Sequence, residues 1–444
     1  MDRILIKNGS LVNEGNIFES DVLIEQDRIK RIDRNISDSK AEVIDAAGQY
    51  ILPGIIDDQV HFREPGLTHK GNIATESRAA IAGGITTFME QPNTDPQTTT
   101  IEKLEAKFDM AAQSSFANYS FLFGGTNDNI EEIKRLDKKA CSGIKLFLGS
   151  STGNMLVDDE EVIEKIFRNT EMVISAHCED EGTIQRNLER YKAEYGNDIP
   201  IKYHPSIRSV EACYLSSSKA IALAKKTGAR LHVFHLSTGK ETDLFRNDIP
   251  LKAKKITSEV CIHHLWFSDV DYGSKGNLIK WNPAVKSSSD RDLLWQALLD
   301  DRIDVVATDH APHTLVEKDN VYTKAPSGGP LVQHALVAML EKFHDGKIAL
   351  EKIVEKMCHN PSILFDIEKR GYLREGYFAD LVIVDLNRPQ KISKENIAYK
   401  CGWSPFEGNT FKSGITHTFV NGHLGYENGN FSERRRAMRL TFKR

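Results

Sequence analysis

The sequence predicts an α/β protein whose main part is a parallel (β/α)8 (TIM) barrel, accompanied by a smaller β-rich module built from both chain ends. Eight buried-type strand segments alternate with amphipathic helical segments in the middle of the chain. Short strands separated by turns fill both ends, and the residues able to bind a metal fall where the middle strands end. Strands that alternate with helices form parallel sheets, so the order of elements indicates the barrel.

The two chain ends share one pattern of short strands broken by turns. The N-terminal strands are predicted at Ile4–Lys7, Leu11–Val12, Val22–Glu25 and Arg28–Asp33, with turns at Asn8-Gly9, Glu14-Gly15 and Gln26-Asp27. The C-terminal strands are predicted at Ala379–Asp385, Ile415–Val420 and Gly422–Tyr426. Neither end could bury a core alone, so we expect them to pair. The predicted boundaries are 1–53 and 366–444 for this module and 54–365 for the barrel.

The middle of the chain supplies the barrel. Its strands are predicted at Ile55–Val60, Ile85–Gln91, Tyr119–Phe123, Ile144–Leu148, Val173–Ala176, Leu231–Phe234, Ile256–Cys261 and Ile303–Thr308. Its helices are predicted at Asn72–Ala82, Ile101–Ala112, Glu160–Arg168, Ser209–Thr227 and Arg291–Leu298. Two further helices are expected at Leu336–Phe343 and Leu350–Met357.

Composition excludes several classes of protein. Of the 444 residues, 40% are hydrophobic and 27% charged, and the net charge of -5 argues against nucleic acid as the main partner. No apolar run is long enough to span a membrane, and the N-terminus lacks a signal core. The cysteines form no CxxC pair, so we expect reduced thiols in a cytoplasmic protein. We expect a solvated tail from the basic C-terminal residues Arg434, Arg435, Arg436, Arg439, Lys443 and Arg444.

Five ligand-type residues stand in or just after predicted barrel strands: His61, Lys145, His177, His235 and Asp309. The C-terminal ends of barrel strands meet at one face, where the active sites of this fold lie. Buried imidazoles and carboxylates need partners, and a divalent cation is a natural one for this set. Three histidines with oxygen ligands suit zinc best, although manganese, cobalt or iron could bind the same set. Asp309 could serve as a metal ligand, as an acid/base, or as both.

Lys145 has two readings. Burial beside a cation should depress its pKa, and a neutral amine can react with carbon dioxide to form an anionic carbamate that bridges two metals. The alternative is a lysine that extends its ammonium toward solvent or toward an anionic substrate. The residue type and its position leave both readings open.

A second group could form a wall that binds a carboxylate: Arg63, Asn93, Asn282 and His313. Arg63 lies two residues past His61, and its planar guanidinium matches a carboxylate. The alternative for Arg63 is a surface ion pair with Glu64. We interpret the other conspicuous histidines as structural: His204, His232, His263 and His264.

The motifs in these segments resemble the amidohydrolase superfamily and, within it, the dihydroorotases. The resemblance is carried in family order by QVHFREPG, EQPNTDP, GIKLFLGSSTGNM, SAHCED, HPSIRSVEA, VFHLS, TSEVCIHHL, KWNPAVK, TDHAPHTLVEK and CGWSPFEG. The resemblance implies a (β/α)8 barrel with a small β-sandwich domain built from both chain ends. It also implies reversible cyclisation of N-carbamoyl-L-aspartate to dihydroorotate, with release of water, in pyrimidine synthesis.

The resemblance implies roles for particular residues. His61, a carboxylated Lys145, His177, His235 and Asp309 match metal positions for one or two Zn²⁺, and Asp309 also matches the catalytic acid/base. Arg63, Asn93 and His313 match residues that hold the substrate carboxylate. Asn282, Ser327 and Gly328 match positions that line the pyrimidine ring.

The sequence departs from the family pattern at Gln59, where a metal-binding histidine is usual. A neutral amide oxygen is a weak zinc ligand, so the second metal position is weakened. A second departure is the segment PSGGPLVQHAL. Two other functions stay open: a cyclic amidohydrolase of the allantoinase or hydantoinase type, and a non-catalytic homologue that partners aspartate transcarbamoylase. We expect a homodimer or a higher homo-oligomer with a small-molecule substrate.

Overall fold

The computed structural model describes residues 3–149 and 155–444 of the chain. Within them, eight strands form a parallel sheet in the order β13-β12-β11-β10-β9-β8-β7-β6. A parallel bridge between Val60, at the end of the first strand, and His310, just beyond the last strand, closes the barrel. The strands are β6 (Ile55–Val60), β7 (Ile85–Glu90), β8 (Asn118–Gly124), β9 (Gly143–Phe147), β10 (Ile174–His177), β11 (Leu231–Val233), β12 (Ile256–Cys261) and β13 (Val305–Ala307). The eight predicted strands are confirmed.

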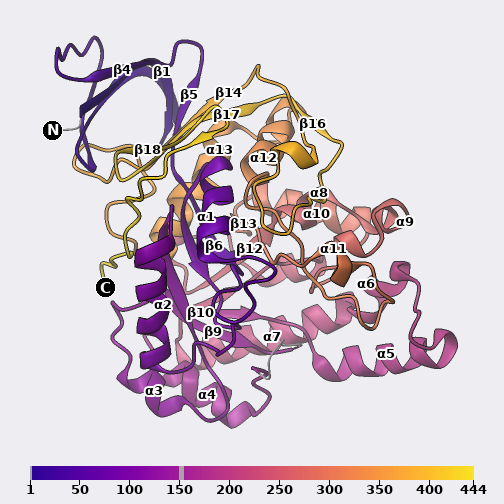
Figure 1. Ribbon diagram of the computed structural model, residues 1–444. Helices are drawn as coiled ribbons and strands as arrows, with labels where there is room; N and C mark the ends of the chain where they lie inside the picture. Colours follow the sequence, from indigo (N-terminus) through magenta and orange to yellow (C-terminus); the bar gives the residue numbers. More distant parts are fainter. Residues whose placement is uncertain (1–2, 150–154) are drawn as a thin grey trace.

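Helices surround the barrel (Figure 1). Asn72 caps α1 with a reciprocal hydrogen bond to Thr75, Ser209 caps α7, and Gly228 ends α7 in the left-handed region. Two short 3₁₀ turns, Lys240–Leu244 and Leu251–Ala253, connect β11 to β12 in place of a helix. The helices between the strands are α1 (Ile73–Ala82), α2 (Ile101–Ser114), α3 (Ile130–Arg135), α4 (Glu160–Arg168), α5 (Glu181–Tyr195), α6 (His204–Ile207), α7 (Val210–Thr227), α8 (Ile262–Trp266), α9 (Tyr272–Lys275) and α10 (Ser288–Leu299).

Four helices follow the last barrel strand. A π-helical turn, Glu355–His359, continues α13, so the helix predicted over Leu350–Met357 changes its hydrogen-bonding pattern near its end. The helices are α11 (Leu315–Lys318), α12 (Ala335–His344), α13 (Leu350–Val354) and α14 (Asn360–Leu364). No helix of the described residues is both long and apolar enough to cross a membrane.

Both chain ends contribute to one nine-stranded sheet, in the order β19-β18-β17-β14-β5-β1-β2-β3, with β4 paired to β1. The sheet curls over an apolar core of its own that includes Ile6, Val22, Leu381 and Phe419 (Figure 1). Its strands are β1 (Arg3–Asn13), β2 (Asn16–Glu25), β3 (Arg28–Asp33), β4 (Glu42–Asp45), β5 (Tyr50–Pro53), β14 (Leu381–Asp385), β17 (Gly414–Val420), β18 (His423–Glu427) and β19 (Asn430–Phe431). A separate hairpin pairs β15 (Gln390–Lys391) with β16 (Thr410–Phe411).

The turn predicted at Asn8-Gly9 is wrong. β1 runs through both residues, and its pairing with β2 shifts register between Ile6 and Gly9. Asn8 has a φ of 61°, in the left-handed region that asparagine tolerates. The residues that suggest a turn therefore form a bulge inside one long strand.

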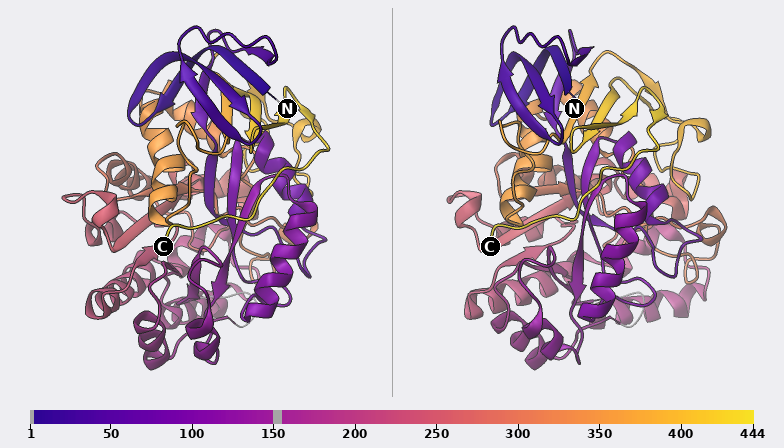
Figure 2. Two further views of the ribbon diagram at one scale, coloured as in Figure 1. Left: turned by 90° about the vertical axis from the view of Figure 1, so that its left-hand side faces the viewer. Right: turned by 60° about the vertical axis from the view of Figure 1, so that its left-hand side comes forward.

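The prediction of a solvated C-terminal tail is right for Arg434, Arg435, Arg436 and Lys443, which are exposed, but wrong for the end of the tail as a whole. Leu440 and Phe442 are buried with Ile56, Val173 and Val305, which lie near the beginnings of their barrel strands. The guanidinium of Arg444 donates hydrogen bonds to backbone carbonyls at Lys138, Cys141, Ser142 and Phe365. Figure 2 shows the C-terminal segment leaving the curled sheet and running across the barrel to the C-terminus. The tail thus closes the N-terminal end of the barrel, opposite the face where the strands end.

Candidate active site

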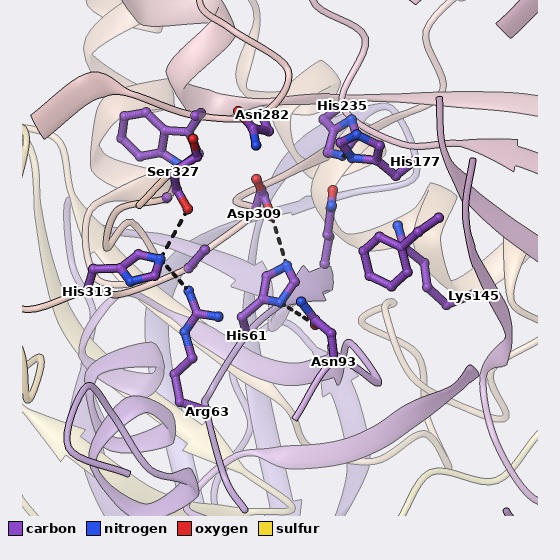
Figure 3. Close-up of a pocket in the computed structure, with 15 residues that line it drawn as sticks. His61, Arg63, Asn93, Lys145, His177, His235, Asn282, Asp309, His313 and Ser327 are labelled. Carbon is purple, nitrogen blue, oxygen red and sulfur yellow. Dashed lines mark hydrogen bonds and ion pairs between the residues drawn. The ribbon is translucent and has the colours of Figure 1, made fainter. Parts of the chain in front are cut away.

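The residues singled out in the sequence line one pocket at the C-terminal ends of the barrel strands (Figure 3). The pocket walls include Gln59, the five residues predicted to bind a metal, and the residues predicted to bind a carboxylate. The pocket is lined by Gln59, His61, Arg63, Asn93, Lys145, Phe147, His177, His235, Trp281, Asn282, Asp309, Ala311, His313, Ser327 and Gly328. Phe147, Trp281 and Ala311 are additions that the sequence did not single out.

Three of these residues have left-handed backbone conformations just beyond their strands. The φ angles are 71° at Arg63, 41° at His235 and 47° at Asp309. Residues other than glycine, asparagine and aspartate rarely adopt this backbone conformation. Such conformations are more frequent at functional sites than elsewhere. The sharp turns occur where strands end, and all three side chains line the pocket.

His177 and His235 face each other. Nδ1 of His177 lies 3.0 Å from Nε2 of His235. Nε2–H of His177 donates to Glu179, 2.8 Å away, and the guanidinium of Arg208 donates to the same carboxylate oxygen. Because Glu179 fixes the ring tautomer, Nδ1 of His177 keeps a lone pair directed toward His235. Arg208 holds the pKa of the buried Glu179 down, at about 2, against the effect of burial, so the carboxylate stays charged.

His61 lies on the other side of the pocket. Its Nδ1 lies 2.9 Å from Oδ1 of Asn93, and its Nε2 lies 3.2 Å from Oδ1 of Asp309. Since the amide oxygen of Asn93 accepts a hydrogen bond, Nδ1 carries the proton and Nε2 offers a lone pair. Asn93 therefore orients His61 in this structure, a contact that differs from the carboxylate-binding role predicted for it.

Lys145 is buried in the middle of β9. Its Nζ lies 4.0 Å from the ring centroid of Phe234 and 4.9 Å from that of Phe147. Burial lowers the pKa of Lys145 to about 7, and the carboxylates of Glu259 and Asp309 oppose that shift. Lys145 is buried among these aromatic rings, so the alternative in which its ammonium extends toward solvent does not match the structure.

The opposite wall of the pocket is cationic. Arg63 is buried, donates from Nε to the carbonyl of Pro312, and places a terminal nitrogen 3.0 Å from Nε2 of His313. Lys70 Nζ lies 3.1 Å from Nδ1 of His313 and 2.9 Å from the carboxylate of Glu317. The surface ion pair considered for Arg63 is not formed, because its guanidinium faces the pocket.

A loop after β13 completes this wall. Nε2 of His313 lies 3.1 Å from the carbonyl oxygen of Ser327. Gly328 has a φ of 129°, and a Cβ there would lie 2.5 Å from the carbonyl oxygen of Ala311. Only glycine allows the loop to approach β13 so closely. The Nζ of Lys318 secures the loop by donating to the carbonyls of Gly328 and Lys280 at 2.7 and 3.3 Å.

Comparison with known proteins places the chain in a family. The amidohydrolase family matches residues 50–425. The dihydroorotase of Methanosarcina mazei is 34% identical over 420 residues, covering 92% of this chain and 91% of the relative. The chain belongs to the amidohydrolase family. The dihydroorotase of Staphylococcus epidermidis is 33% identical over 432 residues, covering 95% of this amidohydrolase and 99% of the relative.

Solved structures agree on the fold of this amidohydrolase. The L-hydantoinase of Arthrobacter aurescens superposes with a TM-score of 0.93 at 28% identity, covering 99% of this chain and 100% of that one. The dihydropyrimidinase of Brevibacillus agri superposes with a TM-score of 0.89 at 25% identity, covering the whole of both chains. This amidohydrolase is therefore a hydrolase with the barrel and β-sheet architecture predicted from its sequence.

The donor set of this amidohydrolase fits a divalent cation. Burial lowers the pKa of His61, His177 and His235, so the rings are neutral, as metal ligands must be. The facing nitrogens of His177 and His235 are close enough to share one cation. Gln59 also lines the pocket, and its amide oxygen lies 3.7 Å from the thiol of Cys261. Family membership and these ligands point to a metal site.

Three of the histidines interpreted as structural, His204, His263 and His264, support the walls of the pocket. His263 stacks on Trp281 with ring centroids 4.3 Å apart, and His264 Nε2 lies 3.1 Å from the carbonyl oxygen of Pro283. His204 bridges the carbonyl of Trp281 and the hydroxyl of Tyr322 at 2.6 and 2.8 Å. All six cysteines are free thiols.

Proposed function

We propose that this amidohydrolase is a dihydroorotase, which interconverts N-carbamoyl-L-aspartate and dihydroorotate, with water released on ring closure, in pyrimidine nucleotide synthesis. Curated dihydroorotases that align over nearly the whole chain support this activity. The observation that carries the choice of substrate is the buried Arg63, which lies beside His313 in the same pocket as the metal-type ligands. A buried guanidinium with few partners calls for an anion, and the ring carboxylate of dihydroorotate is one.

We propose that His61, His177, His235, Asp309 and a carboxylated Lys145 hold the catalytic metal, with Zn²⁺ preferred for this donor set. The lowered pKa of Lys145 supports carboxylation, because only the neutral amine reacts with carbon dioxide. A bound cation would polarise the ring carbonyl and make water more acidic. The weak ligand Gln59 favours one tightly held ion over two.

Asp309 is suited to move the proton in this reaction. Burial raises its pKa to about 7, while Lys145, His177 and Arg63 pull it down. A carboxylate that changes protonation near neutral pH can take a proton from the attacking water and return it to the leaving amide nitrogen. Its Oδ1 already lies 3.2 Å from Nε2 of His61, which keeps the carboxylate beside the ligand cluster.

The wall opposite the metal ligands orients the ring. Arg63 would bind the substrate carboxylate, and His313 and Ser327 set the position of that guanidinium. Oδ1 of Asn282 is buried and has no hydrogen-bond partner among the described residues, so it can accept a hydrogen bond from a ring N–H. Holding the ring at two edges keeps the scissile amide near the ligand cluster.

A substrate pair that differs only in the carboxylate tests this proposal. Dihydrouracil has the ring of dihydroorotate without that group, and it stands for the hydantoinase-like alternative. We expect kcat/KM for dihydroorotate to exceed that for dihydrouracil by about 100-fold, since a charged hydrogen-bonded pair is lost. Equal or faster hydrolysis of dihydrouracil would move the assignment to the hydantoinase-like alternative. Turnover of neither by the metal-loaded protein would favour a non-catalytic homologue.

We also propose the domain limits 1–53, 54–365 and 366–444. They are supported by the position of β5, which ends at Pro53 in the curled sheet, and of β6, which begins at Ile55 in the barrel. The chain returns to the curled sheet at β14.

A further inference from the structure

A second group of ligand-type side chains lies outside the pocket, inside the barrel. Asp58 of β6, His232 of β11 and Glu259 of β12 each offer one ligand atom, and these atoms all lie within 4.8 Å of one another. All three residues are fully buried. None of the three lines the pocket. We call this group the inner cluster.

The inner cluster sits between the pocket and the apolar closure of the barrel. On the pocket side, Oε1 of Glu259 accepts hydrogen bonds from the backbone N–H of His235 at 3.1 Å and the thiol of Cys261 at 3.3 Å. On the other side, the ring of His232 packs edge-on against that of Phe365, with the two ring centroids 5.9 Å apart. Phe365 belongs to the same apolar group as the tail residue Phe442. The apolar group at the N-terminal end of the barrel therefore separates the inner cluster from solvent, and the residues around Glu259 separate it from the pocket.

The polar atoms that face one another in the inner cluster are unsatisfied. Both carboxylate oxygens of Asp58, Oε2 of Glu259 and Nε2 of His232 have no hydrogen-bond partner among the described residues. Leaving so many buried polar atoms without a hydrogen bond is costly, and the two neighbouring carboxylates also repel each other. Such an arrangement calls for a positive charge at its centre.

The geometry of His232 favours a metal ion as that charge. Its Nδ1 lies 2.8 Å from the hydroxyl of Thr257, which can accept its proton and leave a lone pair on Nε2. Nε2 lies 3.3 Å from Oδ2 of Asp58 and 3.8 Å from Oε2 of Glu259. Charge-assisted hydrogen bonds are shorter, at about 2.8 Å. Ligand atoms around a tetrahedral ion with bonds of about 2.0 Å lie roughly 3.3 Å apart.

We infer that Asp58, His232 and Glu259 form a buried site for a divalent cation, distinct from the catalytic pocket. Two carboxylates and a neutral imidazole carry a charge that one such ion balances, and nitrogen with oxygen ligands suits Zn²⁺ or Mn²⁺. The ion would join the first barrel strand to the sixth and seventh across the barrel interior, so its role is structural. The pairing of β6 with β7 shifts register between Asp57 and Val60, so the site occupies an irregular stretch of the first strand.

Metal content tests the site independently of the reaction. The His177→Ala/His235→Ala double variant removes facing pocket ligands, and after loading with Zn²⁺ and desalting we expect it to retain about one equivalent by elemental analysis. Adding Asp58→Asn to this variant should remove that equivalent. Asp57→Asn is the matched control: Asp57 is equally buried, but its carboxylate accepts hydrogen bonds from Thr308. This control should retain the metal.

Two results would overturn the inference. The pocket-deficient variant could hold no zinc, or it could hold the same amount with and without Asp58→Asn. Either result would mean that the inner cluster holds no metal ion. Circular dichroism checks that each variant folds, and His232→Gln replaces Asp58→Asn if the latter does not fold. Because the readout is metal content, the test is separate from that of dihydroorotate hydrolysis.

Discussion

Nδ1 of His177 and Nε2 of His235 lie 3.0 Å apart, at the ends of neighbouring barrel strands, with ring planes inclined by 81°. Glu179 holds the first ring through its other nitrogen, and Arg208 holds Glu179. The tautomer and orientation of His177 are thus fixed by residues behind it, as the proposed metal site requires.

Glu179→Gln should weaken metal binding in the pocket. The neutral glutamine amide cannot balance the charge of Arg208. Its nitrogen cannot accept the hydrogen bond from Nε2–H of His177. We expect the dissociation constant for Zn²⁺ to rise by about 10- to 100-fold, measured by competition with a chromophoric chelator. Glu189→Gln, on the exposed side of α5, is the control and should bind zinc as the unaltered chain does. Equal affinities for both variants would rule out this role for Glu179.

Arg63→Ala should raise KM for dihydroorotate while leaving metal content unchanged. Loss of a charged hydrogen bond costs about 1.5–3 kcal/mol, which corresponds to a rise of roughly 10- to 100-fold. Steady-state kinetics and elemental analysis on the same preparation measure the two effects. Arg246→Ala, which removes an exposed ion pair with Asp248, is the control. An unchanged KM would remove the main reason for assigning a substrate that carries a carboxylate.

Reactivation of metal-free protein by zinc and bicarbonate should depend on pH through Lys145. Its pKa is about 7 because burial disfavours the ammonium, and only the neutral amine forms a carbamate. Recovery of activity should therefore accelerate as the pH rises through about 7 and level off above it. Lys145→Arg, which keeps its charge, should show no bicarbonate-dependent recovery. A recovery rate that does not change between pH 6 and 8 would argue against carboxylation of Lys145.

Phe442→Ala should destabilise the protein although Phe442 lies only two residues before Arg444. The ring is buried at the N-terminal end of the barrel, and truncation of a buried phenylalanine costs about 3 kcal/mol or more. The midpoint of thermal unfolding should fall by several degrees. Lys443→Ala removes a neighbouring exposed side chain and should leave the midpoint unchanged. Equal midpoints for the two variants would show that the tail does not close the barrel.

The sequence predicts the barrel and the metal-type residues of the pocket because both follow from local order, whereas Ser327 and Gly328 are predicted only from the family resemblance. His61, His177, His235 and Asp309 each stand at or just beyond the end of a buried strand, and parallel strands bring such ends together. The curled sheet is predictable for a similar reason, since two β-rich ends need a shared core.

Other features depend on contacts that local patterns do not reveal. Asn8 lies in a bulge because β2 pairs with β1 on both sides of it. The charge of the tail predicts a solvated segment, whereas the alternation of Leu440 and Phe442 with polar neighbours indicates burial. Arg208 acts on His177 from 31 residues away through Glu179. Arg208 stands in the motif HPSIRSVEA, but that motif does not reveal which side chain the arginine contacts.

The central proposal is that this pocket hydrolyses dihydroorotate with a bound metal. The most direct measurement is the hydrolysis rate of dihydroorotate by zinc-loaded protein, by the same protein after chelation, and again after zinc is restored. We predict turnover that chelation abolishes and zinc restores. Absence of turnover at full metal loading, or a rate that chelation to negligible metal content leaves unchanged, would contradict the proposal.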